Sequence, residues 1–251
     1  HLRFGEEMIA KMPKRQQRTV TRFRQLYDMG LQGPDIFYYQ GIIKGEAIGD
    51  LYHSETGIAF FERVCAVVRS NPSEGARAYL YGVLAHYALD SLSHPFINRM
   101  AQEGSLSHSQ IETEFDRYLL ALDGETSPAT FDGSRHMRLT KGECVTVAAL
   151  YPAVTPANVL QSTNTFSAVT KLLATPGTNR RAMMRKAADK VAAKFSPFIM
   201  ADQPNENCAH LDEDLKKLYD EAAALYPVLL EQLTAHMTYN ASLGEQFDKT
   251  F

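Results

Sequence analysis

The sequence predicts an all-α protein, and three observations support this fold class. Apolar residues recur at helical spacing in most segments, as Ile58, Phe61 and Cys65 do. No segment alternates between apolar and polar residues as a half-buried strand does. Glycine and proline pairs divide the chain into pieces of helical length. The 251 residues can bury a substantial core, and we expect one domain over residues 1–251 with about nine or ten helices.

The first half of the chain is expected to form helices over residues 2–12, 14–29, 54–69, 74–94 and 108–122. Pro13 ends the first of these, and Gly33-Pro34 breaks the chain after the second. Asp35 follows that break, where an aspartate can cap the next helix. Residues 41–52 are expected to form a glycine-containing loop. Pro95 is expected to end the helix over 74–94.

The second half is again helical by pattern, over residues 140–150, 156–173, 178–195 and 211–238. Residues 123–139 are polar and rich in turn formers, and we expect an exposed loop there. The many Lys and Arg residues of the helix over 14–29 are interpreted as a solvated face. No apolar run reaches 18 residues, so the sequence predicts no membrane-spanning helix.

Composition narrows the classes of function. The formal net charge is −3, without the basic excess that nucleic-acid-binding domains carry. The three cysteines are widely spaced, which disfavours a disulfide framework or a thiolate zinc site and points weakly to a reducing compartment. We expect a cytoplasmic protein, with secretion as the alternative if an N-terminal segment has been removed.

The most informative stretch is residues 79–94, which is apolar apart from small hydroxyl side chains and three large polar residues. His86, Asp90 and His94 stand four residues apart, so they form one stripe on a helix. A buried polar group without a partner costs roughly 1–7 kcal/mol. The partners of these three side chains are therefore each other, water or a metal ion.

The metal interpretation gains support from further candidate ligands. They are His108 and Glu112, again four residues apart, together with Asp35, His53 and His1. Imidazole and carboxylate ligands suit zinc, and helical pairs four residues apart can bring two ligands to one ion. The alternative is a buried polar network in a helical bundle. His136, His210 and His236 stand alone and are not expected to be ligands.

These pieces in this order resemble the zinc-dependent phospholipase C family, which includes secreted bacterial phosphatidylcholine-hydrolysing enzymes and the catalytic domain of clostridial alpha-toxin. The resemblance runs from His1 to about Asp116, through His-Leu-Arg-Phe-Gly at the start, Gly-Pro-Asp at 33–35 and the pairs described above. It implies an all-helical fold, shared with single-strand-specific fungal nucleases, that holds a cluster of three zinc ions.

The resemblance also implies three ligand sets. The first comprises Asp35, His53, His86 and Asp90, the second comprises His94, His108 and Glu112, and the third comprises His1 and Asp90, with Asp90 bridging two ions. The family completes its third site with an N-terminal tryptophan, and this chain contains no Trp. We therefore expect two or three zinc ions. Ile36 stands where the family has its headgroup-binding tyrosine, so choline preference does not carry over.

The expected activity is hydrolysis of a phosphodiester by a hydroxide held between zinc ions, with Asp35 as both ligand and general base. The substrate would be a phospholipid or a related phosphodiester, with at most transient membrane contact and no stable nucleic-acid partner. Two alternatives remain: a nuclease or nucleotidase of the same fold, and a zinc-binding relative without catalysis. Glu103, Glu114 and Asp116 are expected to be solvated charges, the alternative being that they orient the ligand histidines.

Overall fold

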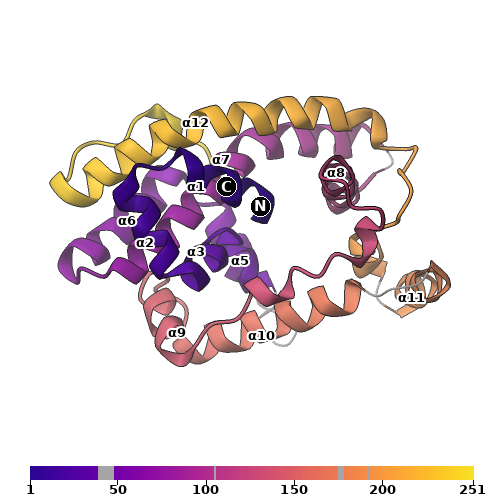
Figure 1. The fold of residues 1–251 in the computed structure, drawn as a ribbon, viewed down its shortest axis with the longest axis horizontal. Coiled ribbons are helices and arrows are strands. Elements are labelled where there is room, and N and C mark those ends of the chain that lie inside the picture. Colours follow the sequence, from indigo (N-terminus) through magenta and orange to yellow (C-terminus); the bar gives the residue numbers. More distant parts are fainter. Residues whose placement is uncertain (39–47, 105, 175–177, 192) are drawn as a thin grey trace. The chain divides into compact units, whose positions relative to one another are not determined.

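The computed structural model describes residues 1–38, 48–104, 106–174, 178–191 and 193–251 (Figure 1). Within these ranges the regular structure consists of eleven α-helices and six short 3-10 segments, and no strand is found. Thr56 and Thr250 form one isolated antiparallel bridge. The all-α prediction is confirmed.

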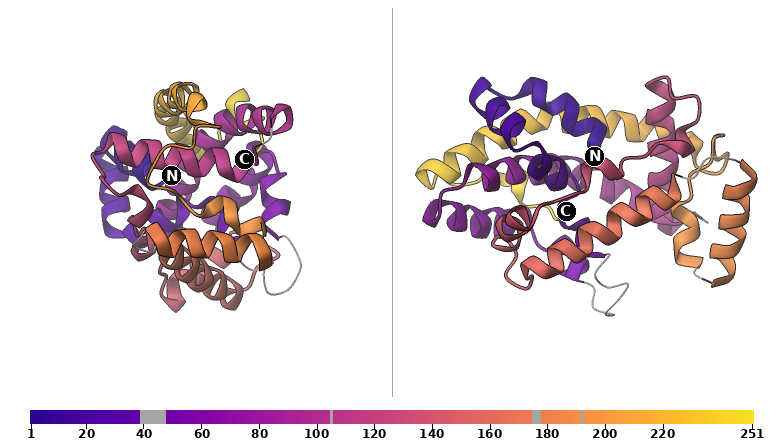
Figure 2. Two further views of the ribbon diagram at one scale, coloured as in Figure 1. Left: turned by 90° about the vertical axis from the view of Figure 1, so that its right-hand side faces the viewer. Right: turned by 60° about the horizontal axis from the view of Figure 1, so that its bottom comes forward.

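The helices are α1 Leu2–Lys11, α2 Lys14–Arg22, α3 Arg24–Gly30, α5 Ile48–His53, α6 Gly57–Ser70, α7 Glu74–Glu103, α8 His108–Leu122, α9 Lys141–Ala148, α10 Pro156–Leu173, α11 Thr178–Val191 and α12 Asp212–Tyr239 (Figures 1 and 2). The 3-10 segment η1 covers Gly33–Phe37 between α3 and α5. Among the helices that can be described, none is both long and apolar enough to cross a bilayer.

The chain forms two compact units. Unit 1 comprises residues 1–92, 134–167 and 220–251, and unit 2 comprises residues 93–133 and 168–219. The long helices α7, α10 and α12 each contribute residues to both units. Because each unit has its own buried side chains, the two are described in turn.

Unit 1 is built around the N-terminal part of α7 and a cluster of buried aromatic side chains. Tyr79 on α7 shares a hydrogen bond of 2.9 Å with the hydroxyl of Tyr151, which follows α9. Gly30 on α3 and Gly82 on α7 allow their backbones to meet, because a Cβ atom at either position would collide with backbone of the other helix. The first and last residues of the chain both belong to this unit, where Figure 1 marks N and C.

Unit 2 has a smaller core, formed by Ile97 of α7, Ile111 of α8 and the buried residues Cys208, Leu211 and Leu215. All three cysteines of the chain are buried and unpaired.

A second buried cluster in unit 2 is charged, and it is formed by Glu114, Arg117 and Asp212. Arg117 donates to Glu114 Oε1 at 2.8 Å, and the backbone N–H of Asn205 donates to Glu114 Oε2 at 3.0 Å.

That cluster corrects one expectation. Glu114 is not a solvated charge, because only 4% of it is exposed. Arg117 and the N–H of Asn205 compensate the loss of water around its carboxylate. Glu103 and Asp116 are exposed, as predicted.

Two helix boundaries also differ from the prediction. Helix α7 does not end at Pro95 but continues to Glu103. A proline inside a helix costs about 3 kcal/mol, and continuation beyond it allows Ile97 to bury its side chain in the unit 2 core. The helix expected over 14–29 is instead α2 and α3, separated at Phe23, whose φ and ψ are −118° and 45°.

Loop predictions were less accurate. The loop expected over 41–52 is wrong for residues 48–52, which form most of α5, while 41–47 lie outside the described residues. Gly49 contributed to that prediction but lies inside α5. Its lack of a side chain serves packing there, because a Cβ atom at this position would collide with the Tyr38 ring. The segment 123–139 is only partly an exposed loop, since it contains two 3-10 turns and buries Ala129, Ser134 and Met137.

Candidate metal centre

Helix α7 carries three of the predicted ligands at successive turns. His86 and Asp90 lie in unit 1 and His94 lies in unit 2. His86 is fully buried and Asp90 is 3% exposed. Because apolar residues fill most of the remaining surface of this part of α7, the two polar side chains are presented to the interior of unit 1.

In unit 1, Asp90 lies between two imidazoles. Its Oδ2 is 3.0 Å from His86 Nε2, and its Oδ1 is 3.4 Å from His1 Nε2. The rings of His1 and His86 are 4.4 Å apart between centroids. The carboxylate therefore directs one oxygen to each histidine.

A second group in unit 1 joins His86 to Asp35 of η1 and His53, the last residue of α5. His53 Nε2 lies 2.7 Å from Asp35 Oδ1, and the His53 and His86 rings are 5.8 Å apart. Gly33 is needed for this approach. Its φ is +49°, and a Cβ there would collide with the His86 ring.

Aromatic rings surround these histidines. Tyr38 stacks on His53 with a centroid distance of 5.3 Å and an interplanar angle of 28°, and the Phe251 ring lies 5.9 Å from His86. Burial, with the nearby carboxylates of Asp35 and Asp50, raises the pKa of Tyr38 well above its ordinary value. Tyr38 and Phe251 thus form aromatic walls beside His53 and His86.

Unit 2 holds a separate group on two helices. Glu112 Oε1 of α8 lies 2.9 Å from His108 Nε2 on the preceding turn and 3.5 Å from His94 Nε2 of α7. Asn98 Oδ1 accepts from His108 Nδ1 at 2.8 Å. Burial raises the pKa of Glu112, but hydrogen bonds and positive charge from His108 and His94 outweigh it and lower that pKa to about 2. Glu112 is therefore an anion at any physiological pH.

The donor atoms fit metal ions. Within the single units, three groups have one ligand atom from each member within 4.8 Å of the others: His1, His86 and Asp90; Asp35, His53 and His86; His94, His108 and Glu112. His86 Nε2 is buried and makes no hydrogen bond, although Asp90 is 3.0 Å away. Two ligand atoms that lie close together without a hydrogen bond between them can both bind one metal ion. Imidazole nitrogen and carboxylate oxygen are ligands that suit zinc.

The structure thus brings all eight predicted ligands into these groups, while their role in binding zinc stays a prediction. Asn98 was missed, although it continues the α7 spacing four residues after His94. The Asp28–His136 pair was also missed, with His136 Nδ1 2.7 Å from the buried Asp28 carboxylate. No sequence spacing connects residues so far apart. Ile36 is buried and so offers nothing to a headgroup.

Comparison with known families decides the relationship. A family profile described as zinc dependent phospholipase C matches residues 1–155. The chain belongs to the zinc-dependent phospholipase C family. No match is found among curated proteins or among solved structures. Every predicted ligand lies within the matched residues, so the family's dependence on zinc and the three groups of donor atoms point to the same part of the chain.

Proposed function

We propose that this member of the family is a zinc-dependent hydrolase that cleaves a phospholipid or a related phosphodiester. One observation carries the proposal: His86 Nε2 is buried without a hydrogen bond beside the buried carboxylate of Asp90. An imidazole in that position costs stability unless a cation binds it. A protein that keeps such a group inside unit 1 is organised to hold a charged ligand there.

The residues of unit 1 have separable tasks. Zinc, when bound, supplies positive charge that lowers the pKa of a water molecule to about 7 and offsets the charge that develops on a phosphoryl group. Asp90 and His86 would hold the ion in the buried part of the site. Asp35 is one-third exposed, at 33% of its side chain, and we assign to its carboxylate the task of accepting a proton from water.

A hydrolysis panel tests the proposal. The purified protein is incubated with phosphatidylcholine vesicles, with a soluble phosphodiester and with single-stranded DNA, each with and without chelator. We expect chelator-sensitive release of diacylglycerol from the vesicles or cleavage of the soluble ester. Release of nucleotides alone would show that the protein is a nuclease of the same fold and not a phospholipase. If none of the three substrates is hydrolysed, the enzymatic proposal is refuted.

Metal content is measured on the same preparations. After purification without chelator we expect between two and three zinc ions per chain, because the ligand atoms form two groups that share His86 in unit 1 and one group in unit 2. A content of less than about one ion per chain would contradict the metal centre itself. Anomalous scattering at the zinc edge would then place each ion that is found.

A further inference from the structure

The exposed face of α2, on unit 1, carries charge of one sign only. Its nine residues, Lys-Arg-Gln-Gln-Arg-Thr-Val-Thr-Arg, include four cations and no acid, in a chain whose formal net charge is −3. Gln16 and Val20 are buried against the unit. The four cationic side chains, Lys14, Arg15, Arg18 and Arg22, are all exposed.

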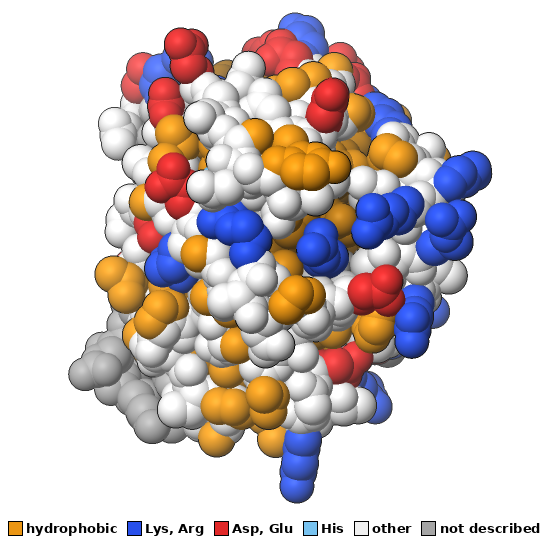
Figure 3. Space-filling view, turned by 90° about the vertical axis from the view of Figure 1, so that its left-hand side faces the viewer, with side chains coloured by type: hydrophobic (Ala, Val, Ile, Leu, Met, Phe, Trp, Pro, Cys, Tyr) orange, Lys and Arg blue, Asp and Glu red, His pale blue; other side chains and the backbone are white. Residues whose placement is uncertain are grey.

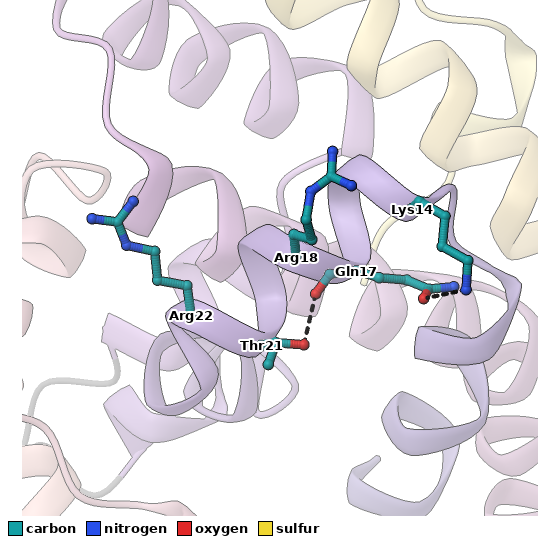
Figure 4. Close-up of a pocket in the computed structure, with 5 residues that line it drawn as sticks. All are labelled: Lys14, Gln17, Arg18, Thr21 and Arg22. Atoms are coloured by element: carbon teal, nitrogen blue, oxygen red, sulfur yellow. Dashed lines mark hydrogen bonds between the residues drawn. The ribbon is translucent and has the colours of Figure 1, made fainter.

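This basic face, defined by those four cations, is also hollowed. An open depression is lined by Lys14, Gln17, Arg18, Thr21 and Arg22 (Figure 4). Figure 3 shows the side of the molecule on which Figure 1 labels α2 and α6, and Lys and Arg side chains gather along one edge of it. The Gln17 side chain is held in place, because Lys14 Nζ donates to it at 3.3 Å and its Nε2 donates to the carbonyl of Met12 at 2.8 Å.

The cations are kept at some cost to the helix. Helix α2 has two of them in its first turn, where the helix dipole favours acids, and its N-cap, Pro13, provides no side-chain hydrogen bond. Arg22 pairs with exposed Glu74 at 3.1 Å. Arg15 and Arg18 form no ion pair with any residue that the structure describes. Their charge is therefore available to a ligand outside the chain.

We propose that the basic face of α2 docks the protein on the surface of a bilayer that contains anionic phospholipid. The inference rests on the proposed function, because a hydrolase of phospholipids must reach lipid packed in a membrane. Phosphate groups match the face in charge, and several basic side chains on one surface attract an anionic leaflet additively. The face carries no exposed aromatic side chain, which argues against stacking with the bases of single-stranded nucleic acid.

Vesicle co-sedimentation tests the docking. The intact protein is mixed with vesicles of phosphatidylcholine alone or with roughly 30 mol% phosphatidylglycerol. We expect tighter binding to the anionic vesicles than to phosphatidylcholine alone, and the difference should shrink as NaCl rises from about 0.05 M to about 0.5 M. The double variant Arg15→Glu/Arg18→Glu should lower the affinity at least about tenfold.

A matched control variant distinguishes the effect of the basic face of α2 from the effect of the protein's total charge. Arg138→Glu/Lys141→Glu removes the same charge from two exposed residues of the same unit, and should change the affinity less than about twofold. An equal loss in both double variants would overturn the proposal, since total charge would then explain the binding. Binding of a short single-stranded oligonucleotide by the parent protein but not by the Arg15/Arg18 variant, with no vesicle binding, would also overturn it.

Hydrolysis of a soluble phosphodiester tells the two proposals apart. The Arg15→Glu/Arg18→Glu variant should cleave the soluble ester at the parent rate and lose activity only on anionic vesicles. Vesicle binding without hydrolysis of any substrate would leave the docking face intact and refute the enzyme. Hydrolysis of anionic vesicles that the double variant does not change would refute the docking face alone.

Discussion

The ligand groups of the two units differ in solvent exposure and in whether their histidines have hydrogen-bond partners within the protein. The unit 2 group lies on two helices and is partly open to water, with 33% of the His108 side chain and 41% of the Glu112 side chain exposed. A protonated His108 donates to Asn98 and to Glu112 at once. In unit 1, by contrast, His86 is fully buried and its Nε2 has no hydrogen bond.

This contrast predicts two kinds of dependence on metal. In unit 2 a proton on His108 can take the place of a cation, so zinc must compete with protons there. In unit 1 the buried Nε2 of His86 makes no hydrogen bond, so no protein contact replaces the contact with a metal ion there. We therefore expect unit 1 to depend on metal for stability and unit 2 to depend on it mainly for ligand geometry.

The largest effect is expected from Asp90→Asn. The change removes the charge that faces both His1 and His86, and the charge stabilisation supplied by a bound metal is worth several kcal/mol. Activity should fall at least about 10³-fold, and zinc should be lost from unit 1 while unit 2 keeps its share. Initial rates and zinc content per chain are the measurements.

Asp248→Asn is the control for that variant, because Asp248 is an exposed aspartate of the same unit. It should keep the parent rate and the parent zinc content. Equal loss of zinc from both units in Asp90→Asn would show that the two groups do not bind independently. A fully active Asp90→Asn protein would remove Asp90 from the centre altogether.

A smaller effect is expected from Asn98→Ala in unit 2. Asn98 accepts the Nδ1–H of His108 and so directs its Nε2 towards Glu112. Loss of such an outer contact typically lowers metal affinity about 10–100-fold. Competition with a zinc chelator measures the affinity, and Asn98→Asp, which retains an acceptor oxygen, should restore most of it. An unchanged affinity in Asn98→Ala would show that Asn98 does not orient His108.

How far the sequence could predict this centre follows from how its parts are built. The pairs four residues apart, such as His108 and Glu112, are local features of one helix, so spacing alone places them together. Asp35 and His53 meet through η1 and α5, and only the resemblance to a family suggested that contact. The Asp28–His136 pair joins residues with no local relation, and no pattern in the sequence predicted it.

Fold prediction failed where tertiary packing outweighs local preference. Pro95 predicts a helix end, yet the core of unit 2 holds the chain helical beyond it. Gly49 predicts a loop, yet it serves a close approach to Tyr38 inside α5. Proline and glycine do disfavour a helix locally. At both positions tertiary packing outweighs that local cost, and the sequence alone does not reveal which side chains pack there.

Metal removal tests the contrast directly, with an expected effect of about tenfold. Without zinc, the buried Nε2 of His86 makes no hydrogen bond, which costs about 1–3 kcal/mol. Chelator should therefore raise hydrogen exchange of the α7 amides around His86 about tenfold or more. The α8 amides around Glu112 should change less. Equal deprotection of the two helices would contradict the difference between the units.

The last prediction concerns the stability of unit 2. The buried carboxylate of Asp212 is poorly compensated there. Glu114 and Asp212 share one cation, Arg117, whose Nη2 lies 4.0 Å from Asp212. Burial, then repulsion from Glu114, raises the pKa of Asp212 from 3.8 to about 7, against the attraction of Arg117. A pKa raised in the folded state stabilises the fold at low pH, and that stabilisation is lost as pH rises from about 4 through about 7.

Asp212→Asn should therefore raise the free energy of unfolding at pH 8 by about 1–3 kcal/mol, and the gain should approach zero near pH 4. Denaturant unfolding at the two pH values measures it. Asp214→Asn, whose exposed carboxylate pairs with Lys217, should change stability by less than about 0.5 kcal/mol at either pH. If Asp212→Asn destabilises the protein at pH 8, the pairing with Arg117 outweighs burial, and unit 2 tolerates buried charge through ion pairing rather than through a proton.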